Sequence, residues 1–275
     1  MNTPSFPLIT FIGGGNMASA IIGGLVRQGH PTARLQVVEP WDEQRAKLTQ
    51  QFPGMAVLPA AGADLQPSDL VVWAVKPQTF KDAATAARPH VSGALHLSVA
   101  AGITSESIAR WLGTERVVRA MPNTPALVGL GMTGLMARAA VSADDKALVE
   151  QVVRTTGELV WVNVEADLDA VTALSGSGPA YVFYFLEAMR DAGAAMGLSP
   201  EVAYQLAVGT FVGASTLAQR SDDPPQVLRE RVTSKGGTTY AAITSMESSG
   251  MKDRFAQALK AAQARAAELG REFGT

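Results

Sequence analysis

The sequence predicts an α/β domain with a mostly parallel, doubly wound sheet, followed by an all-α domain. Three observations support this prediction: short β-rich runs alternate with helical patterns up to residue 162, strand signals stop after Glu165, and a glycine-rich turn follows the first run. Such alternation is typical of βαβ units, whose strands lie parallel. The change of pattern divides the 275 residues into domains 1–164 and 165–275.

The elements of the first domain follow from local patterns along the chain. Its candidate strands are short apolar runs: Leu8–Ile12, Leu35–Val38, Leu70–Val75, Ala94–Val99, Val117–Ala120, Met132–Ala137 and Leu159–Val162. Its candidate helices lie between these runs: Met17–Gln28, Asp42–Gln51, Thr79–Ala87, Glu106–Leu112 and Ala143–Thr155. Ser142 and Asp145 have the spacing of a capping box, which supports the start of the last helix.

The second domain shows helical patterns alone. Ser199 followed by Pro200 combines an N-cap residue with proline at the first helical position. This pair separates a helix near Ala180–Met196 from one near Glu201–Ala218, and a last helix is expected over Gly250–Leu269.

Two stretches of the second domain, residues 170–186 and 202–219, carry no charge over about the width of a membrane. Polar residues and glycines interrupt both, so we interpret them as helices buried in protein without membrane contact. Gly209 and Gly213 share one helix face, where each glycine costs about 1 kcal/mol relative to alanine. Close helix packing would compensate for this cost, which favours a dimerisation domain over a self-contained bundle.

The composition excludes several classes of function. The 23 basic and 25 acidic residues nearly cancel and form no run, so no nucleic acid partner is expected. The sequence has no cysteine, which excludes disulfides and thiolate chemistry, and no metal site is expected. The first basic residue is Arg27, so the start of the chain lacks the charged region of a signal peptide, and a cytoplasmic location is expected.

The first strand leads into Gly13-Gly14-Gly15-Asn16-Met17-Ala18, which matches G-x-G-x-x-A at a strand-to-helix turn. Gly13 permits the tight turn, Gly15 lets a pyrophosphate approach the backbone, and Ala18 allows close packing of helix and sheet. Asn16 and Met17 open the helix, whose N-terminus offers N–H groups to the phosphates. The motif therefore predicts a Rossmann domain, with an ordinary glycine-rich loop as the alternative.

Glu39 ends the second strand, 21 residues after Ala18. An acidic side chain there would accept hydrogen bonds from the adenosine ribose and repel a 2′-phosphate, which favours NADH. Arg45 is near enough in sequence to pair with such a phosphate. The expected cofactor is therefore NADPH or NADH.

Five further segments occur in a specific order: Ala74-Val75-Lys76-Pro77-Gln78, Ser98-Val99-Ala100-Ala101-Gly102, Met121-Pro122-Asn123-Thr124-Pro125, Asp169-Ala170-Val171-Thr172-Ala173-Leu174-Ser175-Gly176-Ser177-Gly178-Pro179-Ala180-Tyr181, and Ser234-Lys235-Gly236-Gly237-Thr238-Thr239. In this order and spacing, the chain resembles pyrroline-5-carboxylate reductase over nearly its whole length. Members of that family carry out the last step of proline biosynthesis.

The resemblance implies a Rossmann domain followed by an all-α dimerisation domain. The implied reaction reduces the C=N bond of 1-pyrroline-5-carboxylate to L-proline with hydride from NAD(P)H. The implied assembly is a homodimer, and larger rings of dimers occur in the family.

The resemblance also assigns residues around the nicotinamide. Ala74, Val75, Lys76 and Pro77 would lie there, together with the turn of Ala100, Ala101 and Gly102. Lys76 is a candidate catalytic or contact residue, with a surface lysine as the alternative. Asn123, held between two prolines, is a candidate cofactor contact or a structural residue.

For the substrate, the resemblance assigns Ser234, Gly237, Thr238 and Thr239 to the carboxylate and the ring nitrogen. We choose the Thr239 hydroxyl for the hydrogen bond to the nitrogen, with Ser234 as a second catalytic candidate. Lys235 departs from the family, which usually has proline there, so the loop is expected to be less rigid.

Other functions stay open at this point. A related imine reductase or a 3-hydroxyacid dehydrogenase would share the architecture, but the second would want a lysine on the interdomain helix, and Pro179–Gly197 contains none. A nucleotide-sensing protein is the alternative outside enzymes. Glu165, at the domain junction, is expected to be a solvated carboxylate, with a site or interface role as the alternative.

Overall fold

The computed structural model describes residues 6–274. The chain divides into two compact units by packing: Met1–Ser177 together with Ala262–Thr275, and Gly178–Ala261. The predicted domain boundary at residues 164/165 falls within the first unit. It stays a prediction, because a packing unit and a domain need not coincide.

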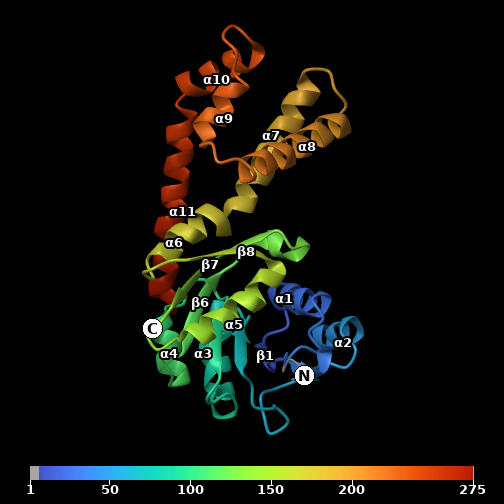
Figure 1. Cartoon of the computed structure of the whole chain (residues 1–275), viewed down its shortest axis with the longest axis vertical. Helices are drawn as coiled ribbons and strands as arrows, with labels where there is room; N and C mark the ends of the chain where they lie inside the picture. The colour runs from blue at the N-terminus through green and yellow to red at the C-terminus, as the bar shows by residue number, and fades with distance from the viewer. Residues whose placement is uncertain (1–5, 275) are drawn as a thin grey trace. The chain divides into compact units, whose positions relative to one another are not determined.

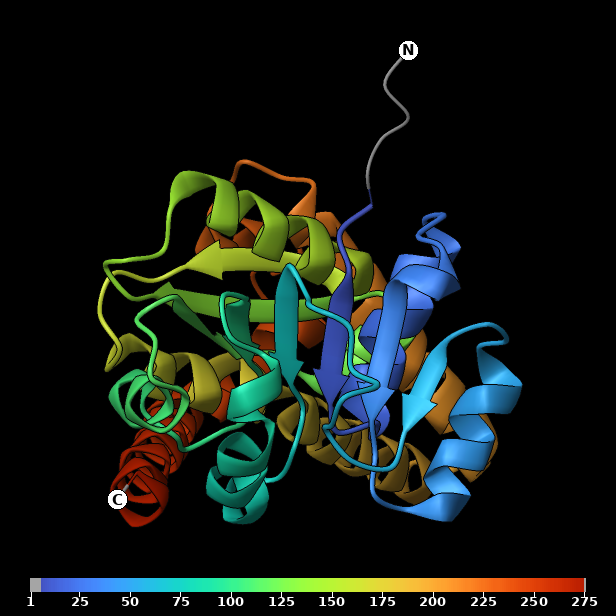
Figure 2. The same cartoon turned by 90° about the horizontal axis from the view of Figure 1, so that it is seen from below.

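Over residues 6–274, one eight-stranded sheet forms the centre of the first unit, in the order β3-β2-β1-β4-β5-β6-β7-β8 (Figures 1 and 2). Every neighbouring pair is parallel except β6 with β7, which is antiparallel. The strands are β1 (Ile9–Ile12), β2 (Leu35–Val38), β3 (Ala56–Leu58), β4 (Leu70–Trp73), β5 (Leu95–Ser98), β6 (Val117–Met121), β7 (Gly131–Ala137) and β8 (Gly157–Trp161). The mostly parallel, doubly wound fold class is confirmed.

Two strand predictions need correction. β3 was missed, because it is only three residues long and partly exposed, so its apolar residues form a shorter run than the strands that we predicted. The run predicted over Leu70–Val75 is too long, since β4 ends at Trp73. Ala74 and Val75 therefore belong to the loop after β4, at the carboxyl edge of the sheet.

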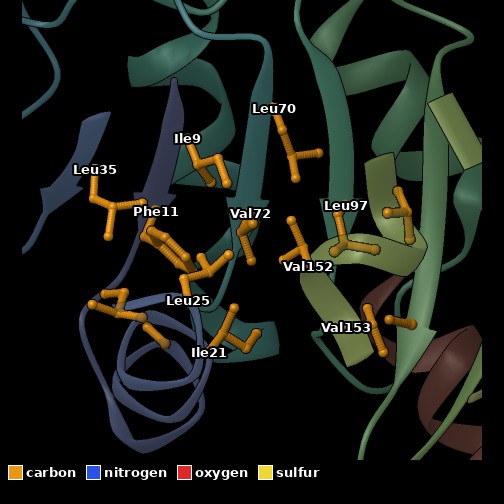
Figure 3. Packing of buried hydrophobic residues seen from close by; sticks show 14 of the residues in the cluster. Ile9, Phe11, Ile21, Leu25, Leu35, Leu70, Val72, Leu97, Val152 and Val153 are labelled. Carbon is orange, nitrogen blue, oxygen red and sulfur yellow. The ribbon is translucent and has the colours of Figure 1, made fainter. Parts of the chain in front are cut away.

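The side chains of β4 alternate between two cores. Leu70 and Val72 join the core formed with α1 (Asn16–Arg27) and α5 (Ala143–Val153), whose packing Figure 3 shows. Trp73 points to the opposite face. A strand buried on both faces reads as a continuous apolar run, which is why this strand was visible in the sequence.

The opposite core lies under α3 (Pro77–Ala87) and α4 (Ser105–Leu112). The end of α11 (Met251–Phe273) also packs with this unit, since Phe273 contacts the same core. Helix α2 (Asp42–Gln51) follows β2, as predicted. The predicted capping box at the start of α5 is confirmed, because the side chains of Ser142 and Asp145 each accept from the other's backbone N–H.

Short helices complete the first unit. α6 (Asp167–Val171) continues into a π-helical turn over Thr172–Gly176. The remaining pieces are short 3-10 turns at Thr32–Arg34, Arg88–His90, Thr124–Val128 and Arg154–Thr156.

The second unit is helical, as predicted. Its helices are α7 (Gly178–Ala195), α8 (Pro200–Gln219), α9 (Pro225–Arg231), α10 (Thr238–Ser248) and the first part of α11. α7 and α8 lie side by side (Figure 1). The Ser199 hydroxyl accepts from the Val202 N–H at 3.3 Å, which confirms the predicted N-cap. Within residues 6–274, every helix is too short or too polar to cross a bilayer.

Substitutions at two adjacent glycines, Gly23 and Gly24, test how α1 packs against the rest of the first unit. A methyl group at Gly24 would lie 2.6 Å from the Thr155 carbonyl oxygen, whereas at Gly23 it would approach only the Arg27 side chain, at 3.4 Å, and Phe52. We therefore expect Gly24→Ala to lower the free energy of unfolding by about 1–3 kcal/mol through overpacking. Gly23→Ala should raise it by up to about 1 kcal/mol, because alanine favours the helix. Chemical denaturation measures both values, and equal effects would contradict this packing of α1.

Candidate active site

The turn after β1 is built on a glycine that no other residue can replace. Gly13 has φ +93°, and a methyl group on it would lie 2.7 Å from the Ala74 carbonyl oxygen. The Ala74 N–H donates to the Ile12 carbonyl oxygen at 2.8 Å, which ties the turn to the loop after β4. β1 and β4 flank the point where the strand order reverses, and open α/β sheets bind ligands at that point.

The next residues of the turn leave room for a ligand. Gly15 is exposed, and a methyl group on it would meet no atom of the described residues within 4 Å, its two chain neighbours aside. Among the described residues, no side chain caps the N-terminus of α1, and its first turn holds no acidic residue. Ala18 is fully buried against the sheet. The N–H groups that open α1 at Asn16 and Met17 are thus placed to receive a pyrophosphate, so the residues present fit a dinucleotide.

Glu39 has a structural role that sequence analysis missed. Its carboxylate accepts from the Gly14 N–H at 2.8 Å and from the Trp41 N–H at 3.0 Å, and the residue is 8% exposed. Gln44 donates to the Gly14 carbonyl oxygen at 2.6 Å. Glu39 and Gln44 therefore hold the middle of the glycine turn, and Glu39 keeps spare lone pairs for a ribose hydroxyl. Its assignment as a ribose contact stays a prediction.

Arg45 lies against the same loop. Its guanidinium donates to the carbonyl oxygens of Glu39, at 3.0 Å, and Pro40, at 2.7 Å, and pairs with Asp42. These contacts hold a positive charge beside the end of β2. Both sequence-based hypotheses, NADH through Glu39 and NADPH through Arg45, therefore keep a structural basis.

The loops predicted to lie beside the nicotinamide follow β4 and β5. Because these two strands run parallel to β1, all three end at one edge of the sheet. Lys76 is exposed and occupies the N-cap position of α3, with Pro77 as its first residue. The Ala100 N–H donates to the Ser98 hydroxyl at 3.3 Å, and Gly102 turns the chain with φ +70° against Leu269. Ala101 lies between them, partly exposed.

Both ends of the Asn123 amide bind protein atoms. Its nitrogen donates to the Ser175 carbonyl oxygen at 3.1 Å, and its oxygen accepts from the Met132 N–H at 2.9 Å. This geometry supports the structural alternative, because a side-chain contact to the cofactor would compete with these bonds. A contact through the backbone of Asn123 stays a prediction.

The predicted substrate loop lies in the second unit, between α9 and α10. Gly236 adopts φ +79°, and the Gly237 N–H donates to the Ser234 carbonyl oxygen at 3.0 Å. A methyl group at Gly237 would lie 2.8 Å from the Ser234 hydroxyl. This hydroxyl therefore lies at the start of α10, where Thr238 and Thr239 are the first helical residues.

The loop can bind an anion. Among the described residues, no side chain caps α10, and no acidic residue lies in its first turn. Helix N–H groups without a cap attract carboxylates, and the Ser234 hydroxyl adds a donor. Thr239 is half-buried and Lys235 is exposed. The structure thus brings together the four residues predicted to bind substrate.

A doubly wound sheet with an uncapped glycine turn at its switch point is typical of a dinucleotide-binding domain. Comparison with known proteins defines the class as a dinucleotide-dependent oxidoreductase: residues 8–102 match the family model described as NADP oxidoreductase coenzyme F420-dependent. Residues 165–269 match the model described as pyrroline-5-carboxylate reductase dimerisation.

Full-length relatives narrow the class to one family. The chain is 46% identical to a pyrroline-5-carboxylate reductase of Pseudomonas aeruginosa, covering 98% of this chain and 99% of the relative. It is 36% identical to the soybean (Glycine max) protein of that name, covering 94% of each. The chain belongs to the pyrroline-5-carboxylate reductase family, which confirms the resemblance seen in the sequence.

Solved structures agree with this assignment. A pyrroline-5-carboxylate reductase from Coxiella burnetii superposes with a TM-score of 0.91 at 38% identity, covering 96% of this chain and 99% of that one. The Plasmodium falciparum pyrroline carboxylate reductase with NADP bound superposes with a TM-score of 0.84 at 29% identity, covering 96% of this chain and 98% of that one. A reductive aminase from Aspergillus terreus, at 18% identity and a TM-score of 0.60, shares the fold.

Two glycine substitutions distinguish a residue needed for cofactor binding from a residue needed for the fold. Gly15→Ala should leave the melting temperature unchanged, because its methyl group meets no protein atom. It should weaken NADPH and NADH binding about tenfold or more, because the methyl group occupies the pyrophosphate position. Gly13→Ala should instead destabilise the fold, because of its positive φ and the Ala74 oxygen. Calorimetric titration and thermal melting test this contrast, and unchanged affinity in Gly15→Ala would contradict the cofactor assignment.

Proposed function

We propose that the chain reduces the C=N bond of 1-pyrroline-5-carboxylate to L-proline, with NADPH or NADH as the hydride source. This is the last step of proline biosynthesis. The observation that carries the proposal is the uncapped start of α10 beside the Ser234 hydroxyl, an arrangement of donors that suits a carboxylate. It occurs in a chain whose other unit carries the dinucleotide turn, and relatives of nearly the same length carry the name of this activity.

The chain's own residues position the reactants. The pyrophosphate would bind the backbone of the glycine turn and of the helix that follows, at Gly13, Gly15, Asn16, Met17 and Ala18. The remainder of the dinucleotide would bind Glu39, Asn123 and the loops Ala74–Pro77 and Ala100–Gly102. The bound nicotinamide supplies the hydride.

At the second unit, the substrate carboxylate would bind the N–H groups from Gly237 to Thr239 and the Ser234 hydroxyl. The Thr239 hydroxyl would donate a hydrogen bond to the ring nitrogen. An imine nitrogen is basic and can arrive protonated, so the site needs no strong acid, in keeping with a second unit that contains no histidine. Lys76 would add an exposed positive charge beside the nicotinamide loops.

We also propose that the active protein is a homodimer formed through the second unit, as the matched dimerisation model suggests. In the single chain, α8 leaves Leu206, Val212 and Leu217 between 57% and 70% exposed. Apart from the backbone of α8 itself, methyl groups at Gly209 and Gly213 would meet no atom of residues 6–274 within 4 Å, so a second copy could approach this face closely. Rings of dimers would be a further level of assembly.

The proposal also covers the cellular location of the protein and its partners. The cytoplasm is the proposed place of action, because the reaction consumes reduced nicotinamide dinucleotide, which metabolism regenerates there. No nucleic acid partner is proposed, since the two signs of charge nearly balance.

The direct test mixes the protein with cyclised glutamate semialdehyde and reduced cofactor. We expect nicotinamide absorbance to fall while an equal amount of proline forms. If neither NADPH nor NADH were consumed, or if proline were absent from the products, the proposed function would be wrong.

A hydroxyl deletion tests the role of Thr239. Thr239→Ala should lower kcat/KM about 10- to 100-fold, since hydrogen bonds to charged groups contribute about 1.5–3 kcal/mol. Thr239→Ser retains the hydroxyl and should recover most of the activity. Wild-type turnover in Thr239→Ala would remove this residue from the mechanism.

A further inference from the structure

Glu165, in the segment between β8 and α6, receives hydrogen bonds from three donors in the first unit. Its Oε1 accepts from the Ser105 N–H at 2.5 Å and from Arg119 Nη1 at 2.7 Å. Its Oε2 accepts from the Ser105 hydroxyl at 2.7 Å. The expectation of a solvated carboxylate is therefore wrong: Glu165 joins the start of α4 to strand β6.

The charges around Glu165 keep it ionised. Burial would raise the pKa of its carboxyl group, but hydrogen bonds from Ser105 and Arg119 outweigh burial and lower that pKa. Asp169 lies near the same arginine, and burial raises the pKa of its carboxyl group, with the Glu165 charge adding to the rise. Arg138 donates to the Ser105 hydroxyl at 3.2 Å. A half-buried carboxylate thus meets a buried guanidinium, and charge-assisted hydrogen bonds fix their relative orientation.

The position of Ser105 gives this network its significance. Ser105 is the first residue of α4 and lies three positions after Gly102, the last residue of the turn that we assign to the nicotinamide end of the cofactor. Arg119 precedes Met121, the last residue of β6, by two positions. One carboxylate therefore ties the far end of the nicotinamide turn to the neighbouring strand.

We propose that Glu165 is a positioning residue for cofactor binding and hydride transfer. Through Ser105, it fixes where the Ala100–Gly102 backbone stands relative to β6. Small displacements of groups that orient a reactant reduce both binding and turnover. This inference rests on the proposed function, because it takes the Ala100–Gly102 turn as a contact of the nicotinamide.

A second ion pair with one buried partner, Arg116 with Asp145, provides a matched control. Arg116 donates to Asp145 at 2.6 Å, and Asp145 also accepts from the Ser142 N–H at 3.0 Å, so it too joins a helix start to β6. Arg116 comes just before β6, which runs parallel to β5. This pair therefore lies at the opposite edge of the sheet from the turn after β5.

The experiment compares Glu165→Gln with Asp145→Asn in the full-length protein. Each substitution removes one negative charge that pairs with an arginine and places an amide against that arginine. Calorimetry measures NADPH and NADH affinity without substrate, steady-state kinetics give KM and kcat, and amide hydrogen exchange reports the Ser105 N–H. Thermal melting reports the stability of each variant.

We expect both variants to melt at lower temperature. Glu165→Gln alone should weaken cofactor affinity about tenfold, raise the cofactor KM, lower kcat and speed exchange at Ser105. The KM for 1-pyrroline-5-carboxylate should change little. If Glu165→Gln fails to fold, Ser105→Ala replaces it in the experiment. This variant removes one of the three hydrogen bonds to Glu165. It should show the same pattern with a smaller loss of cofactor affinity, about two- to threefold.

The inference would be overturned by wild-type cofactor affinity in Glu165→Gln, or in Ser105→Ala where that variant replaces it. Equal loss of affinity in Asp145→Asn would overturn it as well, because stability alone would then explain the effect. The affinity measurement needs no substrate. If the wild-type protein binds cofactor but forms no proline, the proposed function is wrong. The affinity of Glu165→Gln for the cofactor would still test the role of Glu165.

Discussion

The close approach of the β1–α1 turn to the loop after β4 is the constraint on which the rest of the cofactor site depends. Gly13 takes a positive φ beside the Ala74 carbonyl oxygen, with no room for a side chain. This contact places the N-terminus of α1 at the switch point of the sheet, which is where open α/β sheets bind their ligands. Glu39 then accepts from the Gly14 N–H, and Gln44 donates to the Gly14 carbonyl oxygen. The turn is thus set before any ligand binds.

Local features of the chain made much of the fold predictable. Buried parallel strands such as β4 appear as apolar runs, and the capping residues Ser142 and Ser199 mark helix starts within a few residues of sequence. The glycine turn was recognisable for the same reason, because its function depends on consecutive residues. β3 lacked such a signal, being three residues long and partly exposed.

Long-range partners were not predictable from local patterns. Glu165 meets Ser105 across 60 positions and Arg119 across 46, and no spacing rule connects them. Asn123 was recognised as a candidate, but its bond to Ser175, 52 positions away, was not. The substrate loop was assigned through family resemblance, and its uncapped helix start supplies the physical reason that this segment suits a carboxylate.

In the function that we propose, the two units divide the chemistry: the turn after β1 would bind the pyrophosphate, and the loop before α10 would bind a small anion. The proposal requires hydride to pass directly from the bound dinucleotide to the bound imine. The most direct measurement supplies NADPH carrying deuterium at the transferable position and analyses the proline by mass spectrometry. The account predicts one deuterium per proline, bound to the carbon of the former C=N bond. Unlabelled proline, with the deuterium released to water, would contradict it.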